Sequence, residues 1–330
     1  MFDVEKEYKN IVTRIGITLI FFLFVSNLLV GCSELANLLC YTFIPESDVL
    51  YIVTDLVSSF AYLFSFILPV PFFYMISKGS VTHPLNLAVT LPSPFSGIKL
   101  FAIIMAGLAV ITSASYLNSL IFPVSGDAVS ELTDLDFSSP YMLVLGFIST
   151  ALFPAFAEEF LFRCLIVSNI KPYSKSAAVV LSAVAFGLMH QNPMQLLFAT
   201  AAGVAFGIIY VETDSIWCCI ALHFINNFIS LMQSYVYYVF NGEVAALLNY
   251  FFDVFVTLVG LICAICLLLS VKKKKTKAGV GVYGDYKFSE EKRITAFDFS
   301  QKALTNPAFF VFLLFCVIQS VVVGVMLKTM

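Results

Sequence analysis

The sequence predicts an all-α fold, a polytopic bundle of about nine transmembrane helices. Hydrophobic residues make up 60% of the 330 residues and charged residues only 12%, whereas a soluble domain carries about 25% charged residues. Runs of about 20 apolar residues recur along the chain, and each is long enough to cross a hydrocarbon core. Because lipid offers the backbone no partners, each run must satisfy its own N–H and C=O groups, which requires a helix.

The apolar runs, taken in order, define the expected spans: 11–31, 51–77, 98–122, 141–168, 175–191, 194–212, 215–239, 248–271 and 307–327. They divide the chain into three sections. Residues 1–139 hold the N-terminal spans, and residues 140–240 hold a core that carries the cluster of intramembrane polar side chains. Residues 241–330 hold the C-terminal spans and a cytoplasmic connector.

Charge in the connections predicts the orientation of the bundle. Lys6, Lys9 and Arg14 lie at the first span, and the lysine run at 272–275 closes the eighth. The connection at 32–50 contains no Lys or Arg. Positive charge near span ends marks the cytoplasmic side. We therefore expect a multi-pass integral membrane protein with a cytoplasmic N-terminus and an external C-terminus, and the compact, Phe-rich chain favours a bacterial cell membrane.

The end of the first span resembles a bacterial lipoprotein cleavage box, Leu29-Val30-Gly31-Cys32. The segment before it is acidic as well as basic, and many spans follow, which favours an ordinary transmembrane helix. The sequence leaves open whether Cys32 is lipidated or pairs with Cys40.

Charged residues inside the fourth span are the most unusual feature of the chain, because each costs about 2.5–3.5 kcal/mol at the centre of a span. Glu159 and Arg163 are four residues apart, share a helix face and are expected to pair. Glu158 is rotated by about 100° from Glu159. This leaves one unpaired carboxylate, which is suited to act as a general base. Pro154 is expected to kink the helix just before the pair.

Two of the three histidines also lie inside predicted spans. His190 follows Phe186 by four residues, and Asn227 follows His223 by four, so each pair shares a helix face. With a rise of about 1.5 Å per residue, Glu158 and the two histidines can lie at one depth. The pattern predicts a small polar cavity between the middle helices.

Each of these features also has a purely structural interpretation. A histidine or asparagine within a span often only links helices, and a Glu–Arg pair often only stabilises the fold. Glu158 is the hardest to explain in this way. The residues lie on three neighbouring helices, which Gly203 and Gly207 of the sixth span allow to approach closely. Together they favour a functional site.

The motifs resemble those of the CPBP family, which comprises CAAX prenyl proteases and bacteriocin-processing enzymes also called Abi proteins. That family shows E-E-x-x-x-R, F-x-x-x-H and H-x-x-x-N on successive spans. In this chain all three occur in order and without departure, over about residues 140–240: Glu158-Glu159-x-x-x-Arg163, Phe186-x-x-x-His190 and His223-x-x-x-Asn227. The resemblance implies an intramembrane endopeptidase.

Carried over by motif position, the resemblance implies six catalytic-site residues: Glu158, Glu159, Arg163, His190, His223 and Asn227. Glu158 and His190 would activate the attacking water, and the Glu159–Arg163 pair would support the site. His223 and Asn227 would stabilise the oxyanion or help to hold a metal.

The cofactor is left open by the sequence. Two histidines and a glutamate with a water match one ligand set of catalytic zinc, which makes Glu158, His190 and His223 candidate Zn²⁺ ligands. The chain has no H-E-x-x-H motif, which would indicate zinc far more strongly. A metal-free mechanism, in which the glutamate activates the water, is the alternative.

The leading hypothesis is a CAAX-type intramembrane (metallo)endopeptidase that cleaves membrane-anchored, prenylated or hydrophobic peptides. The first alternative is a non-catalytic bacteriocin-immunity or scaffold protein of the same fold. The second is an ion-coupled transporter, against which the clustering of the polar residues counts. No basic patch interleaved with aromatic residues suggests nucleic acid. The expected partners are therefore the peptide substrate and the lipid bilayer, and the oligomeric state is left open.

Overall fold

The structure is a computed structural model that describes residues 4–77, 97–122, 137, 139–240, 242–274 and 296–329. Within these residues every regular element is a helix. The prediction of an all-α fold is confirmed.

The chain up to the end of the fourth expected span forms α1 (Val4–Phe43), α2 (Asp48–Ile67), α3 (Pro69–Ile76), α4 (Gly97–Ile121), α6 (Pro140–Gly146), η1 (Phe147–Leu152), α7 (Phe153–Glu159), η2 (Phe160–Val167) and α8 (Ser168–Ile170). The elements η1 and η2 are π-helical. The remainder forms α9 (Lys175–Met189), α10 (Pro193–Thr213), α11 (Ile216–Val239), α12 (Gly242–Lys274), α13 (Ala296–Leu304) and α14 (Pro307–Thr329).

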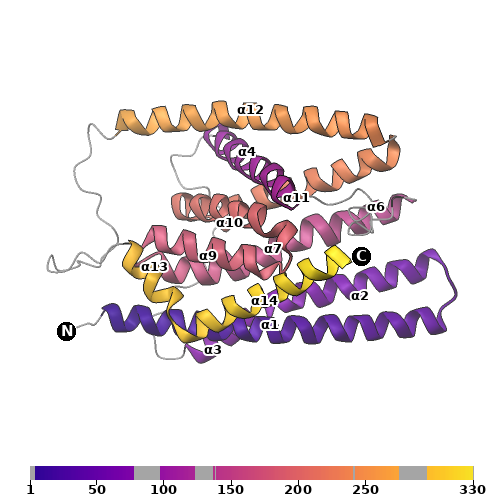
Figure 1. The fold of residues 1–330 in the computed structure, drawn as a ribbon, viewed down its shortest axis with the longest axis horizontal. Coiled ribbons are helices and arrows are strands. Elements are labelled where there is room, and N and C mark those ends of the chain that lie inside the picture. The colour runs from indigo at the N-terminus through magenta and orange to yellow at the C-terminus, as the bar shows by residue number, and fades with distance from the viewer. Residues whose placement is uncertain are drawn as a thin grey trace.

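Figure 1 shows α1 and α2 as a long hairpin along one side of the molecule and α12 along the opposite side. Between them, α12 packs on α4, α4 on α10, and α10 on α9, while α14 packs on α1. The short α7 contacts both α2 and α11. The middle section of the chain thus occupies the interior of the bundle, and the first and last sections enclose it.

Eight helical stretches of the described residues are long and apolar enough to cross a membrane. The chain is therefore a polytopic integral membrane protein, as predicted. The expected span at 175–191 forms the 15-residue α9 instead, which is shorter than a full crossing needs. The expected span at 51–77 is divided at Pro69, because proline lacks the N–H that would continue the helix.

Several helices begin at capping residues that the sequence displays. The side chain accepts a hydrogen bond from a backbone N–H two or three residues later at Ser47, Ser139, Ser174 and Asn192. Pro140 and Pro193 follow two of these caps, at a position where a missing N–H costs no hydrogen bond. These signals fix where α6 and α10 start.

Glycines allow α9 and α10 to approach closely. A methyl group on Gly203 would lie 2.8 Å from Cα of Ala183, and one on Gly207 would lie 3.3 Å from the Val179 side chain. Such contacts are closer than side chains tolerate, so only glycine permits this spacing. The close approach predicted from Gly203 and Gly207 is confirmed.

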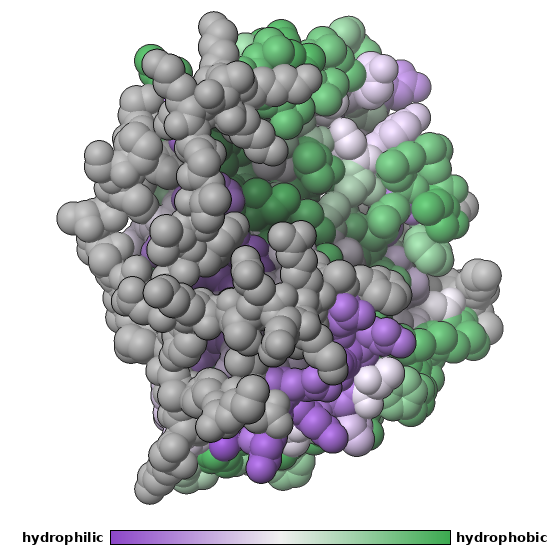
Figure 2. All heavy atoms as spheres, turned by 90° about the vertical axis from the view of Figure 1, so that its left-hand side faces the viewer, coloured by the Kyte–Doolittle hydropathy of each residue, from purple (hydrophilic) through white to green (hydrophobic). Residues whose placement is uncertain are grey.

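The outer surface of the bundle is apolar where lipid is expected. Large exposed side chains include Leu258 and Leu268 of α12 and Phe310 of α14. Figure 2, which looks at the end of the molecule where α1 begins, shows a hydrophilic patch beside hydrophobic residues. An apolar side surface with polar ends is the pattern of a membrane-embedded bundle.

Cys32 and Cys40 lie on the same continuous helix, α1, and both thiols are free. Eight residues of α-helix place them about 12 Å apart along the axis, whereas a disulfide requires Cα atoms within about 7 Å. The two cysteines of one chain therefore do not pair in this structure.

The cytoplasmic connector expected at 276–306 lies outside the described residues, except for 296–306, which contains α13. Lys302 of α13 pairs with Glu5 of α1, with Nζ 2.6 Å from Oε1. The start of α1 and the end of this connector therefore lie on the same side of the bundle, as expected. Which side faces the cytoplasm stays a prediction.

Candidate active site

The span that carries both glutamates is not a regular α-helix. After α6 it passes through η1, the short α7 and η2. Pro154 lies at the start of α7, and its missing N–H interrupts the α-helical hydrogen bonds there. The expected kink therefore takes the form of wider π-helical turns on both sides of Glu158 and Glu159. Such π-helical turns are rare in proteins as a whole, but those that occur are often found at functional sites.

Glu159 and Arg163 form the ion pair that their spacing predicts. Arg163 Nε lies 3.1 Å from Glu159 Oε2, and both side chains are fully buried. Arg163 Nη2 donates to the Gly203 carbonyl at 3.2 Å. The guanidinium carbon lies 4.7 Å from the Phe186 ring centroid and 5.0 Å from that of Phe206, within range of cation–π attraction. The pair thus connects η2 with α9 and α10.

His223 of α11 lies between the two glutamates. Its Nδ1 is 2.9 Å from Glu159 Oε1, and because a carboxylate accepts hydrogen bonds, Nδ1 carries the proton. The imidazole stacks on Phe206, with centroids 4.8 Å apart and an interplanar angle of 20°. Its Nε2 faces Glu158 Oε2 at 3.9 Å, which is too far for a direct hydrogen bond. Glu159 and Phe206 therefore fix the ring with Nε2 directed at Glu158.

Glu158 has a different environment from its neighbour. It is 4% exposed, and Tyr62 of α2 donates a hydrogen bond to its Oε1. Its Oε2 makes no hydrogen bond to any described residue. The prediction that Arg163 pairs with Glu159 rather than with Glu158 is confirmed, although Tyr62 means that Glu158 is not wholly unpaired. A buried oxygen without a hydrogen-bond partner is costly, so Glu158 is a candidate for the reacting carboxylate.

Tyr62 is a site residue that the sequence does not reveal. It is one of 15 tyrosines in the chain, and it precedes Glu158 by 96 residues. Nothing in its local pattern separates it from the other aromatic residues of an apolar span. Only the packing of α2 on α7 brings its hydroxyl to the glutamate.

Replacing Tyr62 by Phe leaves Glu158 Oε1 without a donor in a buried site. We expect this change to lower the free energy of unfolding by about 1–3 kcal/mol. Thermal unfolding of the purified protein in detergent measures the loss. Tyr237→Phe is the matched control, because that side chain is 52% exposed. Equal unfolding temperatures for the two variants would contradict the hydrogen bond between Tyr62 and Glu158.

His190 joins the site through Phe186 rather than through the carboxylates. Its Nδ1 donates to the Phe186 carbonyl at 2.8 Å, just after the last residue of α9. The Phe186 ring centroid lies 5.2 Å from that of His190 and 5.9 Å from that of His223. In the described part of the chain, no direct contact joins His190 to either glutamate. The bond to a carbonyl places the proton on Nδ1 and leaves Nε2 as the acceptor of the neutral ring.

Asn227 lies one turn beyond His223 on α11. Its Nδ2 donates to the Thr150 carbonyl of η1 at 3.2 Å, and its Oδ1 accepts from Asn226 at 3.1 Å. Asn227 therefore holds α11 against η1 in this structure. One hydrogen of Nδ2 is left for a further acceptor, and the oxyanion role suggested for this residue stays a prediction.

The described residues do not gather a metal site. In that part of the chain, no group of three or more His, Cys, Asp or Glu side chains could hold an ion. Glu158 and His223 approach each other, but the His190 ring is held by the Phe186 carbonyl. The predicted zinc ligands Glu158, His190 and His223 are therefore not gathered into one group in the described residues, and zinc binding stays a prediction.

Comparison with known proteins confirms the resemblance to the CPBP family over the middle of the chain. Residues 140–229 match the family described as "Type II CAAX prenyl endopeptidase Rce1-like". The chain is also 36% identical over 80 residues to YdiL of Bacillus subtilis (strain 168), a candidate membrane peptidase. That stretch is 23% of this chain and 32% of the relative, so the similarity spans about a third of that protein's length. No solved structure matches the chain.

The matched segment contains all six predicted site residues, from Glu158 to Asn227. Tyr62 lies outside it, as do α4 and α12. The similarity therefore covers the motif set, whereas the helices that enclose the site are interpreted from their contacts alone.

Proposed function

We propose that this chain is a CAAX-type intramembrane endopeptidase that hydrolyses membrane-anchored, prenylated or hydrophobic peptides. One observation carries the proposal. A buried carboxylate oxygen of Glu158 without a hydrogen-bond partner among the described residues faces an imidazole nitrogen of His223 at 3.9 Å, inside a span. The family match over residues 140–229 supports the same reaction class.

The nucleophile in this proposal is a water molecule held between Glu158 Oε2 and His223 Nε2, because one water bridges polar atoms at such a separation. Glu158 accepts a proton as the water oxygen attacks the scissile carbonyl carbon. The resulting oxyanion is stabilised by a nearby hydrogen-bond donor, for which Asn227 Nδ2 is the candidate. When the C–N bond breaks, Glu158 returns its proton to the leaving amine.

Glu159 and Arg163 position His223 rather than react. Glu159 pairs with Arg163 and accepts the hydrogen bond from His223 Nδ1. This arrangement leaves Nε2 free to hold the water. In the proposed mechanism His223, rather than His190, assists Glu158, because His223 is the histidine beside its Oε2.

Zinc analysis of the purified protein adds a separate measurement. About one zinc per chain in active protein, with activity lost on chelation, would add a metal to this mechanism. Full activity of metal-free protein would leave the hydrolysis to these side chains.

The experiment that tests the proposal compares the N-termini and C-termini of membrane proteins in cells that carry the native chain or Glu158→Gln at matched levels. The variant keeps the shape of the side chain and its bond from Tyr62 but removes the proton acceptor. We expect a set of termini that appears only with the native chain, and the sequences around them identify the substrate class. Asp55→Asn is the matched control, because Asp55 is a carboxylate of α2 outside the site.

Identical termini in both cell lines would contradict the proposal. If the host phenotype of the native chain also persisted in the Glu158→Gln cells, the result would assign the chain to the non-catalytic immunity or scaffold class. New termini that persist in the Glu158→Gln cells would instead show hydrolysis that does not use this carboxylate.

A further inference from the structure

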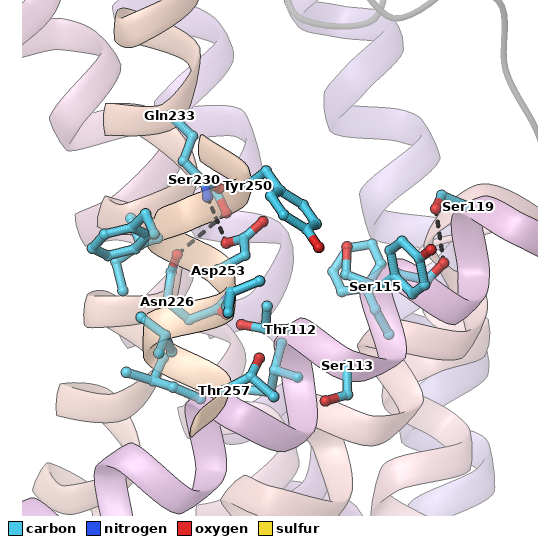
Figure 3. A pocket seen from close by; sticks show the side chains of 18 of the residues that line it. Thr112, Ser113, Ser115, Ser119, Asn226, Ser230, Gln233, Tyr250, Asp253 and Thr257 are labelled. Atoms are coloured by element: carbon cyan, nitrogen blue, oxygen red, sulfur yellow. Dashed lines mark hydrogen bonds between the residues drawn. The ribbon is translucent and has the colours of Figure 1, made fainter. Parts of the chain in front are cut away.

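A second polar region lies between α4, α11 and α12. It is a pocket of about 780 Å³, lined mainly by these three helices, with Phe198 of α10 at one wall. Figure 3 shows hydroxyl and amide side chains from all three helices turned toward one space, with Asp253 near its middle. Apart from Phe198 of α10 and a short stretch of α11, this pocket lies outside the segment that matches the family. Its residues are therefore not explained by the motifs of the active site.

Asp253 is a carboxylate inside a membrane span. It lies 11 residues into the stretch Gly242–Ser270, which is about 16 Å along the helix. Gln233 donates to its Oδ1 at 2.7 Å, and Asn249 in turn donates to the Gln233 carbonyl at 3.2 Å. No cation of the described residues pairs with Asp253. An intramembrane carboxylate without a cation is costly and is a candidate binding group for a positively charged ligand.

The pocket lies beside the active site along α11. His223, Asn226, Ser230 and Gln233 are spaced by three, four and three residues, so they form one stripe on the helix. Asn226 donates to Asn227 at 3.1 Å, which joins the pocket to a predicted site residue. Gln233 lies ten residues beyond His223, or about 15 Å along the axis. A ligand in the pocket can therefore extend from the reacting atoms.

The lining suits an extended hydrophobic peptide, because polar side chains are set within a larger apolar surface. A peptide inside a membrane must satisfy its backbone N–H and C=O groups, and hydroxyl and amide side chains such as Thr112, Ser230 and Tyr250 offer both donors and acceptors. A span of about 15 Å corresponds to about four or five residues of extended chain. A cation on the peptide at that separation would meet Asp253.

We propose that the pocket between α4, α11 and α12 is a substrate subsite for an extended peptide whose Lys or Arg side chain, about four or five residues from the scissile bond, pairs with Asp253. This inference rests on the proposed function, because it takes the bound peptide to be the substrate. The substrate class is thereby narrowed to hydrophobic peptides that carry a basic residue near the cleavage position.

The test measures binding without cleavage, in the full chain carrying Glu158→Gln and reconstituted in phosphatidylcholine vesicles. The probes are synthetic 12-residue peptides of Leu, Ala and Ser, with one Lys moved through each position, and the same peptides with norleucine in its place. We expect one or two positions at which the Lys peptide binds about tenfold more tightly than its norleucine partner. In Asp253→Asn that preference should disappear. Asn keeps an acceptor for Gln233, so this variant retains the internal hydrogen bond.

Asp55→Asn is the matched control, because it removes an intramembrane carboxylate of α2 that does not line the pocket. Equal binding of Lys and norleucine peptides at every position would overturn the inference, as would a Lys preference that survives Asp253→Asn. A third result, in which phosphatidylethanolamine displaces the peptides only when Asp253 is present and no Lys position is preferred, would assign the pocket to an amine headgroup and would also overturn it. Hydrolysis is absent from this assay, so its outcome is independent of whether the native chain cleaves peptides.

Discussion

His223→Ala is expected to slow peptide cleavage by about a hundredfold to ten-thousandfold, the usual contribution of a positioned acid or base. The alanine removes the nitrogen that faces Glu158 Oε2 at 3.9 Å and the donor to Glu159 at 2.9 Å. The ion pair between Glu159 and Arg163 is untouched, so the fold should survive. The rate is measured in vesicles with the peptide that the comparison of termini identifies. Ser234→Ala, a half-buried change on the same helix, is the control and should keep the native rate.

The double variant Glu158→Gln/His223→Ala makes this prediction sharper. Two side chains that hold one water act as a unit, and removing the second then costs little once the first is lost. We expect the double variant to be no slower than the slower single variant. Rate losses that multiply would show that Glu158 and His223 act in separate steps. A His223→Ala enzyme that keeps half the native rate would remove His223 from the mechanism.

Contacts within one helix could be predicted from the sequence. Glu159 and Arg163 pair because four residues place two side chains on one face, and this holds even where the helix widens into η2. The spans could be predicted because lipid forces any long apolar run to satisfy its own backbone. Gly203 is a similar case, since a missing side chain permits close packing whatever the partner helix is.

Contacts between helices could not be predicted in the same way, because periodicity gives the face of a helix but not its rotation or height against a neighbour. The motif positions predict His190 as the partner of Glu158, whereas the packing of α11 on α7 places His223 beside it. Tyr62 and Asp253 cannot be recognised from the sequence either, again because their roles depend on contacts between helices. Each looks like an ordinary member of its span until α2 packs on α7, or until α4, α11 and α12 enclose a pocket.

Arg163→Met is expected to have the largest effect on stability, lowering the free energy of unfolding by about 3–5 kcal/mol. The reason is that Glu159 and Arg163 are both fully buried, so the variant leaves a carboxylate in the core with only His223 beside it. The bond to the Gly203 carbonyl and the contacts with two phenylalanine rings are also lost. Unfolding of the purified protein by heat or denaturant in detergent measures the change. Arg163→Lys should fall between native and Arg163→Met, because lysine restores the charge but not the planar fork.

The double variant Arg163→Met/Glu159→Gln tests why Arg163→Met loses stability. It removes the uncompensated charge while keeping an oxygen that can accept from His223 Nδ1. If the loss in Arg163→Met comes from an unpaired buried charge, the double variant should recover most of the stability, since replacing both members of a buried pair is far less costly than removing one. A double variant as unstable as Arg163→Met would instead attribute the loss to the arginine's packing against Phe186 and Phe206. If stability returns but the cleavage rate does not, the ionised Glu159 is required to position His223 and not only to balance Arg163.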